Sequence, residues 1–373
     1  ICRGVNRSAY SVRPNPGGGG YWLDERPPFT FDPLLHAGCY YVQEAASMVI
    51  DSVVASLQLT KPVTCLDLCA APGGKSTALC AALPEGSTIV SNEPLKARAQ
   101  VLAENMTKWG CPGSIVTNNY SADFAQAELL FDLILVDAPC SGEGMFRKDA
   151  DAVKTWSEKK VRDCTALQRA ILAVAWRCLR PGGTLIYSTC TLNTHENEEQ
   201  LLWLVQAAGA EVPPYMEELC GAAVGWGCLG SLLPGHEELP VLRFMPGFTR
   251  SEGLCVCAVQ RKGYREATDP ERLRSVICKR LQTLPLHPLA EAGQPQVALD
   301  YASAIAYLRG EAVVLPADAP SGVVSVTYGG HALGQAKNLG PRANNLYPKP
   351  WRIKSSHVPA SPPVVVTNRQ MDK

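Results

Sequence analysis

The sequence has no apolar run long enough to cross a membrane and no signal-peptide pattern, which predicts a cytoplasmic protein with no membrane partner. It has no net charge, because 35 basic residues balance 35 acidic ones, and this balance predicts no partner until it is divided by region. Cys and His residues do not recur at the spacing of a zinc site, so we expect no metal. The 15 cysteines stand singly, often within apolar runs, which is typical of buried thiols in a reducing compartment.

The chain does contain one stretch, residues 65–77, that reads as a strand, a glycine turn and a helix. An apolar run ends at Asp67, an Ala-Pro-Gly-Gly turn follows, and a helical pattern opens at Lys75. In an open α/β sheet, a nucleotide-like ligand binds at the carboxyl end of the first strand. Glycines at such a turn allow close backbone approach, and the helix N-terminus offers free N–H groups to an anion.

This turn lacks the two commonest nucleotide signatures. A phosphate loop requires glycine at position 69, where the chain has Cys69, and the turn does not contain the nicotinamide fingerprint Gly-x-Gly-x-x-Gly. A nucleoside cofactor without an extended phosphate chain remains, and we favour S-adenosylmethionine, whose carboxylate would be the anion. The alternative is an ordinary strand-to-helix turn that contains two glycines.

Periodicity divides the chain into three parts. Strand and helix patterns alternate over residues 61–265, which predicts a mostly parallel sheet covered on both faces. Residues 1–60 are expected to hold the remnant of an N-terminal domain and a lead-in helix over 40–55. Residues 266–373 contain short strand patterns and one short helix at 301–308, which predicts a small α+β or barrel-like domain.

The C-terminal part has an uneven distribution of charge. Residues 319–371 contain no Asp or Glu, whereas basic side chains alternate there with aromatic ones. Basic and aromatic side chains together are typical of nucleic-acid binding, because they neutralise phosphates and stack on bases. A solvated basic tail is the alternative. The residues are Lys337, Arg342, Lys349, Arg352, Lys354 and Arg369, with Tyr328, Tyr347 and Trp351 among them.

Acids and thiols follow the predicted strands. Glu93 comes just after the strand at 88–91, where an acid can accept both hydroxyls of a ribose, although it can equally open the next helix. Asp137 ends the strand at 131–137 and is followed by Cys140, while Cys190 follows the strand at 184–189. Because the carboxyl ends of parallel strands share one edge, we expect these three side chains to meet there.

Two thiols and an acid at one site suit methylation of a pyrimidine at C5. This carbon becomes nucleophilic when a thiolate adds at C6, and an acid near N3 stabilises the charge that builds up in the ring. A base must then remove the C5 proton so that the thiol can leave. One cysteine as nucleophile and a second cysteine assisting release would account for both steps.

These segments together resemble the RNA cytosine-C5 methyltransferases of the NOL/NOP/Sun family. The matching segments are residues 67–75, 92–93, 137–144 and 187–191. The resemblance spans residues 11–262, and residues 11–15 look like the end of the family's N-terminal domain. Residues 307–311 and 328–337 resemble the PUA-like region of the bacterial RsmF-type branch, which methylates small-subunit ribosomal RNA.

The resemblance implies a fold class and a set of roles. The fold would be a Rossmann-like α/β methyltransferase domain with a mostly parallel sheet, a partial N-terminal domain and a C-terminal α+β PUA-like RNA-binding domain, in a monomer. It implies that Cys190 is the nucleophile, that Cys140 assists release and that Asp137 lies between cofactor and cytosine. The implied cofactor-binding residues are Cys69, Ala70, Ala71, Pro72, Gly73, Gly74, Lys75, Glu93, Asp137 and, for the adenine, Asn119 or the backbone beside it.

Three alternatives stay open at this point. Cys140 could be the nucleophile, as in DNA cytosine methyltransferases, which attack from a Pro-Cys pair. The substrate could be tRNA instead of 16S ribosomal RNA. The chain could also be a catalytically silent RNA-binding ribosome assembly factor, although the presence of both thiols, the acid and the glycine turn disfavours this.

Overall fold

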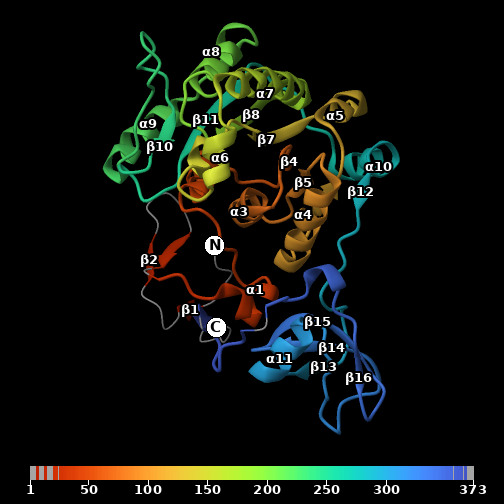
Figure 1. The fold of residues 1–373 in the computed structure, drawn as a ribbon. Coiled ribbons are helices and arrows are strands. Elements are labelled where there is room, and N and C mark those ends of the chain that lie inside the picture. The colour runs from red at the N-terminus through yellow and green to blue at the C-terminus, as the bar shows by residue number, and fades with distance from the viewer. Residues whose placement is uncertain are drawn as a thin grey trace.

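A computed structural model describes residues 6–7, 12–14, 20–23, 25–355, 357–363 and 365–367. Some residues named from the sequence therefore lie outside the described residues, among them Ser11 and Asn15 of the expected N-terminal remnant and Arg369 of the basic stretch. The described chain forms a large lobe around one sheet and a smaller lobe around another, with α1 (Pro33–His36) beside the smaller lobe (Figure 1).

The large lobe is organised around five parallel strands in the order β8-β7-β4-β5-β6. Their bounds are β4 (Thr64–Asp67), β5 (Thr88–Asn92), β6 (Ser114–Thr117), β7 (Phe131–Asp137) and β8 (Leu179–Thr189). Strands β4, β5 and β7 are almost fully buried, as their apolar sequences require of strands covered on both faces. The predicted Rossmann-like architecture is confirmed.

Antiparallel strands extend the sheet at both ends. On one side β11 (Leu254–Arg261) pairs with β8, and β10 (Leu242–Phe244) and β9 (Ala210–Glu211) pair with β11. On the other side β12 (Thr283–Leu284) pairs with β6. The pattern of residues 254–260 predicts a late strand, antiparallel and at the edge of the sheet. Strand β11 is antiparallel, but it is not at the edge, because β10 and β9 pair on its far side.

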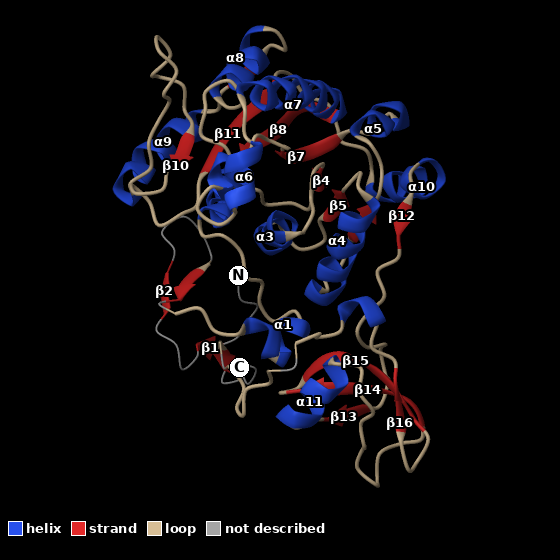
Figure 2. Cartoon of the chain, viewed as in Figure 1, coloured by secondary structure: helices blue, strands red, loops and turns tan. Residues whose placement is uncertain are grey.

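Helices cover both faces of the large sheet (Figure 2). One face packs against α5 (Ser121–Ala127), α7 (Glu158–Cys178), α8 (Glu198–Gln206) and α10 (Pro270–Arg280). The other face packs against α2 (Val49–Ser56), α3 (Gly74–Ala82) and α9 (Pro214–Ala223). Helix α4 (Lys96–Trp109) packs beside β6 and the glycine turn, and α6 (Ala150–Thr155) precedes α7.

Three local predictions differ from the structure. The lead-in helix begins at Val49 and not at residue 40: Tyr41 and Gln43 lie against Gly74 at the start of α3, and Ala46–Met48 form a short 3-10 helix. The sequence Arg-Pro-Gly-Gly at 180–183 predicts a turn, yet it forms a bulge within β8, since Phe131 pairs with Leu179 and Leu133 with Thr184. Residues 210–240 are rich in Gly and Pro and predict no helix, yet Pro214–Ala223 form α9.

The smaller lobe contains a four-stranded sheet with one covering helix. Its strands are β13 (Gln296–Ala298), β14 (Gly322–Tyr328), β15 (His331–Asn338) and β16 (Ala343–Asn345), and its helix is α11 (Tyr301–Leu308). Only the β13–β14 pair is parallel. The sequence predicts that the C-terminal domain starts at residue 266. In the structure, residues 270–284 include α10 and β12, which pack on the large sheet.

The core of the smaller lobe includes a residue from near the other end of the chain. Phe31 packs with α11 and the four-stranded sheet, and the Tyr301 hydroxyl donates to the Phe31 carbonyl at 3.2 Å. Helix α1 contacts α11 and β15. Tyr347, expected to be available for base stacking, is 2% exposed and packs against Tyr307, because a core this small needs large side chains.

Candidate active site

The carboxyl ends of the parallel strands bring most of the predicted site residues to one edge of the large sheet. Asp67 ends β4, Glu93 follows β5, Asp137 ends β7 and Cys190 follows β8. Parallel pairing of β4 with β5 and β7, and of β7 with β8, points all four ends the same way. This edge is where open α/β sheets bind their ligands.

The glycine turn between β4 and α3 is held by the neighbouring helix α4. Arg98 Nη2 donates to the Ala71 carbonyl at 2.8 Å, and Asn105 Nδ2 donates to the Pro72 carbonyl at 2.8 Å. Gly73 has a φ of +116°, a conformation that side chains disfavour. A Cβ atom there would lie 3.2 Å from the side chain of Leu102. The turn therefore needs glycine to expose its backbone at the start of α3.

The rest of the turn forms the inner wall of the site. Ala70 and Ala71 are buried, and the Ala70 N–H donates to the Asn92 carbonyl at 2.8 Å, which ties the turn to β5. Burial, aided by nearby carboxylates, raises the pKa of Cys69, so that its thiol stays neutral. Gly74 leaves room for Gln43, whose Oε1 would lie 3.0 Å from a Cβ atom at that position.

Asp67 is a buried acid with spare hydrogen-bonding capacity. Its Oδ2 accepts from the Ser76 hydroxyl at 2.6 Å, whereas its Oδ1 accepts no hydrogen bond from the described residues. Burial raises the pKa of this carboxyl to about 7, and the charge of Asp137 adds to the effect. A buried, half-satisfied carboxylate beside a glycine turn fits a ligand that brings a cation or an N–H donor.

Glu93 and Asn119 lie just after β5 and β6, at the same edge of the sheet. The buried Glu93 accepts from the Leu95 N–H at 3.0 Å, and its second oxygen lies 3.4 Å from Arg98. The structure does not turn the Asn119 side chain toward the cluster, because its amide exchanges two hydrogen bonds of 2.9 Å with the Gln282 backbone. The Asn119 backbone stays near Glu93, since its carbonyl accepts from Asn92 Nδ2 at 2.9 Å.

Asp137 is fixed by two side chains. Lys75 Nζ donates to Oδ2 at 2.7 Å, and the Ser188 hydroxyl donates to Oδ1 at 2.7 Å. Burial disfavours the Lys75 cation, yet its pKa is raised because the charge and hydrogen bond of Asp137 outweigh the burial. A charged lysine therefore stands at the base of the site, within the electrostatic range of Cys190.

The two thiols meet as predicted. The Sγ atoms of Cys140 and Cys190 are 3.2 Å apart and share a hydrogen bond. This hydrogen bond lowers the pKa of Cys190, and the Lys75 cation lowers it further. The same hydrogen bond, together with burial, raises the pKa of Cys140. Cys190 is thus the thiol that ionises first, and the thiolate is the nucleophilic form.

Sequence reasoning missed three polar groups of this site. The sequence places Ser188, which positions Asp137, only within a strand, and Glu196 stands just after Cys190, where an acid is typical of a helix start. Glu143 was read only as part of a loop motif, yet it accepts from the Leu192 N–H at 2.8 Å, while Glu196 accepts from the Ser141 N–H at 2.9 Å. An acid within six residues of each cysteine was the signal available.

A cavity adjoins the loops that carry the two thiols. It has a volume of about 930 Å³, runs along α7 and is lined in part by Trp156, Val161, Asn193 and His195. Within the described ranges, no group of three or more His, Cys, Asp or Glu residues could hold a metal ion. Among these residues, no helix has the length and apolar composition that a membrane crossing requires.

Comparison with protein families gives two matches. Residues 54–258 match the model described as 16S rRNA methyltransferase RsmB/F. Residues 294–353 match the model described as the methyltransferase RsmF PUA domain.

Curated relatives include the ribosomal RNA small subunit methyltransferase F of Salmonella heidelberg and that of Salmonella paratyphi A. Each is 42% identical to this chain over 192 residues, which are 50% of this chain and 40% of the relative. The match thus spans less than half the length of these relatives.

Solved structures resemble the large lobe. A methyltransferase homolog from Pyrococcus horikoshii has a TM-score of 0.56 and 25% identity, over 68% of this chain and 79% of its own. The NSun6 protein of the same organism, solved with SFG, has a TM-score of 0.53 and 23% identity, over 66% of this chain and 60% of its own. The latter likeness concerns the fold alone.

Proposed function

The chain belongs to the RsmB/F family of 16S rRNA methyltransferases, and from this premise we propose that it methylates C5 of a cytosine in RNA, with S-adenosylmethionine as cofactor. We propose small-subunit ribosomal RNA as the substrate, in keeping with the relatives' printed names. The observation that carries the chemistry is the 3.2 Å separation of the Cys140 and Cys190 sulfurs beside the Lys75–Asp137 ion pair.

The residues at the sheet edge fit this cofactor. Asp67 offers an unpartnered carboxylate oxygen, and the turn from Cys69 to Lys75 offers backbone groups at the start of α3, so both would hold the amino-acid end. Glu93 would accept the ribose hydroxyls, and the backbone beside Asn119 would face the adenine. When bound, S-adenosylmethionine supplies an electrophilic methyl group.

Cys190 would start the reaction. Its thiolate donates an electron pair to C6 of the cytosine, and the new Sγ–C6 bond pushes the C5–C6 π electrons to C5. C5 would then take the methyl group, as the bond between the methyl carbon and the cofactor's sulfonium sulfur breaks and leaves its electron pair on that sulfur. The lowered pKa of Cys190 and the adjacent Lys75 cation favour this assignment over attack by Cys140, whose pKa is raised.

Asp137 would bind the cytosine ring during this step. Its two oxygens are oriented by Lys75 and Ser188, so the carboxylate has a fixed direction. As the electron pair from Cys190 moves into the ring, N3 would take up a proton from solvent, and Asp137 would accept hydrogen bonds from that N3–H and from the 4-amino group, which stabilises the ring as charge develops on addition at C6.

Cys140 would assist release. A base removes the C5 proton, the released electron pair restores the C5–C6 double bond, and the Sγ–C6 bond breaks to return the Cys190 thiolate. The Cys140 sulfur lies next to the sulfur that must depart, so it can take part in this proton transfer. Neither thiol would have to travel between the two steps.

The test compares two alanine variants on the same RNA. With cofactor and a 16S fragment, Cys140→Ala should accumulate a covalent protein–RNA adduct that survives denaturing electrophoresis, whereas Cys190→Ala should form none. The reverse pattern would make Cys140 the nucleophile. Absence of adduct and of methylation in both the parent and the variants, with RNA binding intact, would identify a silent assembly factor. Bisulfite sequencing of rRNA and tRNA from cells with and without the gene would identify the substrate.

The smaller lobe fits a role in RNA binding. Its match to an RNA-methyltransferase PUA model covers residues 294–353, which include most of the described basic side chains of the acid-free stretch. We propose residues 1–60, 61–265 and 266–373 as the functional divisions of the chain, with α10 and β12 at the start of the last division packed on the large sheet, and we propose that the chain acts as a cytoplasmic monomer. A filter-binding titration with and without residues 286–373 replaced by a tag would measure the contribution of this lobe.

A further inference from the structure

The loop that carries Cys140 is bound to the loop that carries Cys190 through a carboxylate on each side. Glu143, three residues after Cys140, accepts from the N–H groups of Leu192 and Asn193 at 2.8 and 3.0 Å. Glu143 thus captures two consecutive backbone donors of the opposite loop. Carboxylates bind N–H donors more strongly than neutral acceptors do.

Glu196 makes the converse connection. Its Oε2 accepts from the Ser141 N–H at 2.9 Å and from Gln168 Nε2 at 2.7 Å. Glu196 and Gln168 are both 0% exposed, so this contact is sheltered from water. The loop after Cys190 therefore captures a backbone donor of the Cys140 loop, and helix α7 anchors the pair.

One side chain joins the two carboxylates. Asn193 Nδ2 lies 3.1 Å from Glu143 Oε1 and 2.8 Å from Glu196 Oε1. The loops also touch directly, because the Gly144 N–H donates to the Cys190 carbonyl at 2.8 Å. A Cβ atom on Gly144 would lie 2.7 Å from that carbonyl oxygen, so only glycine allows this approach.

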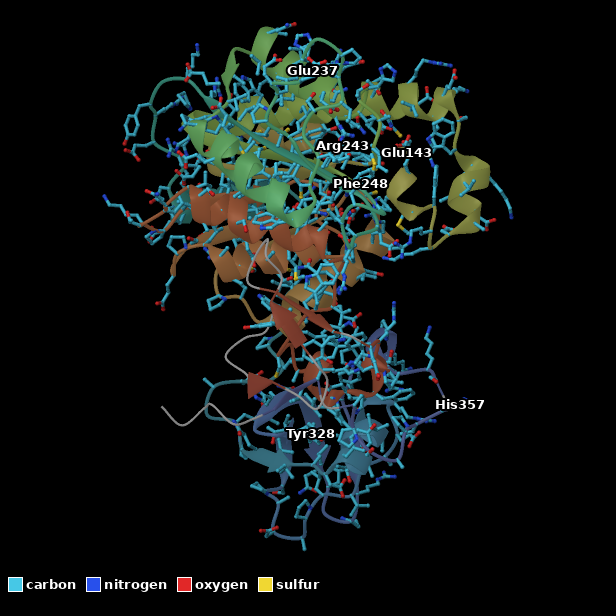
Figure 3. The ribbon with its side chains drawn as sticks, turned by 90° about the vertical axis from the view of Figure 1, so that its left-hand side faces the viewer. Glu143, Glu237, Arg243, Phe248, Tyr328 and His357 are labelled. Atoms are coloured by element: carbon cyan, nitrogen blue, oxygen red, sulfur yellow. The ribbon has the colours of Figure 1, made fainter. Side chains whose placement is uncertain are left out.

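The outer side of the Cys190 loop is held as well. Arg243 of β10 donates to the Leu192 carbonyl, while Glu143 accepts from the Leu192 N–H, so both backbone polar groups of Leu192 are occupied. Figure 3 shows Glu143 and Arg243 together in the large lobe. Loop ends that would otherwise move are fixed from several directions, and the thiols they carry are fixed with them.

We propose that Glu143 and Glu196 are positioning residues that hold the Cys140 sulfur against the Cys190 sulfur for release of the methylated base. The inference rests on the proposed two-thiol reaction and assigns to it residues that do not touch the substrate. Attack needs only Cys190, the base and the methyl donor, whereas release needs both sulfurs in register. Loosening the connection between the loops should therefore slow release more than attack.

The first test is kinetic and uses isosteric variants. The Glu196 carboxylate accepts hydrogen bonds from Ser141, Gln168 and Asn193. In Glu196→Gln, the new amide NH₂ faces at least one of these three donors, so the Cys140 loop is no longer held in place against the Cys190 loop. We expect kcat to fall by roughly 10- to 100-fold, as misplacement of a reacting group does, with KM for RNA falling in parallel and kcat/KM unchanged, because the slowed step follows formation of the adduct. The covalent adduct should accumulate, as in Cys140→Ala. Glu143→Gln should behave the same way and serves as the second variant.

The matched control is Asp132→Asn. Asp132 also bridges neighbouring elements, accepting from the Thr64 N–H at 2.8 Å and from Arg180 Nε at 2.6 Å, but it lies at the opposite end of β7. This variant should lose thermal stability to a similar degree without accumulating adduct. If it accumulates adduct equally, or if Glu196→Gln keeps wild-type kcat without adduct, the positioning role is refuted.

The second test needs no RNA. Diamide oxidises two nearby thiols to a disulfide and is itself reduced to the hydrazine, with both thiol protons transferred to it. Peptide mapping by mass spectrometry should show rapid formation of the 140–190 disulfide in the parent protein, because the sulfurs are 3.2 Å apart. Both glutamine variants should form it on the order of tenfold more slowly, and Asp132→Asn at the parent rate.

The two tests separate the failure modes. If the parent and Cys140→Ala form no adduct with any RNA, the proposed function fails, yet the disulfide rates still decide whether the carboxylates fix the sulfurs. If the parent methylates RNA and all disulfide rates are equal, the function stands and the positioning role is overturned.

Discussion

Replacing Arg243 by methionine should destabilise the large lobe strongly. Arg243 of β10 pairs with Glu198 of α8, and both side chains are 0% exposed. In Arg243→Met, the Glu198 carboxylate stays buried with only the Leu232 N–H, at 2.8 Å, as a described donor. Leaving one charge of a buried pair uncompensated costs about 3–5 kcal/mol, a large part of the ~5–15 kcal/mol that stabilises a typical domain.

The magnitude can be measured in two ways. Each kcal/mol shifts the melting temperature of a lobe of this size by about 2–4 °C, so Arg243→Met should melt roughly 6–20 °C lower. Urea unfolding followed by tryptophan fluorescence should show the same loss in the free energy of unfolding. Arg243→Met combined with Glu198→Leu removes both charges and should be more stable than either single variant.

Two outcomes of this comparison of single and double variants would refute the reasoning. Suppose that Arg243→Met lowers the free energy of unfolding by less than about 1 kcal/mol, the value typical of an exposed ion pair. The Glu198 carboxylate is then hydrated, and the pair is not buried in solution. If the double variant is as unstable as the sum of the two single variants, the loss comes from side-chain packing and not from an uncompensated charge.

Three further predictions concern the sheet edge. Lys75→Met removes a cation that lowers the pKa of Cys190, so the pH–rate curve for adduct formation should move to higher pH. Each unit by which the pKa rises should slow the reaction at neutral pH by ~10-fold, and an unshifted curve would contradict this. Gly73→Ala forces a side chain into φ +116° and should weaken cofactor binding by roughly 5- to 150-fold in calorimetry, whereas Gly221→Ala, with open space around it, should bind normally. Glu93→Gln should weaken the cofactor by about 10-fold or more, and a dissociation constant within twofold of the parent would exclude its ribose role.

The parts of the fold that were predicted correctly have strong local signals. The strand β7 and the helix α11 have the bounds that periodicity gave, because each is a complete apolar pattern with a clear end. The confirmed family resemblance came from motifs at strand ends, where chemistry restricts the residues. The meeting of Cys140 with Cys190 followed from parallel strand order alone.

The parts that were not predicted depend on contacts between distant segments. The Asn119 amide is used by the backbone of Gln282, which no local pattern around Asn119 reveals. Tyr347 reads as an exposed aromatic among basic residues, yet the small core needs it. Glu143 and Glu196 each accept a backbone hydrogen bond from the opposite loop, and these contacts can be seen only once both strand ends are placed together.

The packing of Phe31 against α11 has a consequence for synthesis of the chain. Phe31 leaves the ribosome 270 residues before Tyr301, whose hydroxyl binds its carbonyl. At the usual ~5–20 residues per second, this early phenylalanine waits roughly 14–54 s for its partners. During that interval the large sheet can close while an apolar leading segment is still unprotected. Nascent chains stalled near residue 290 should therefore bind chaperones through residues 29–36.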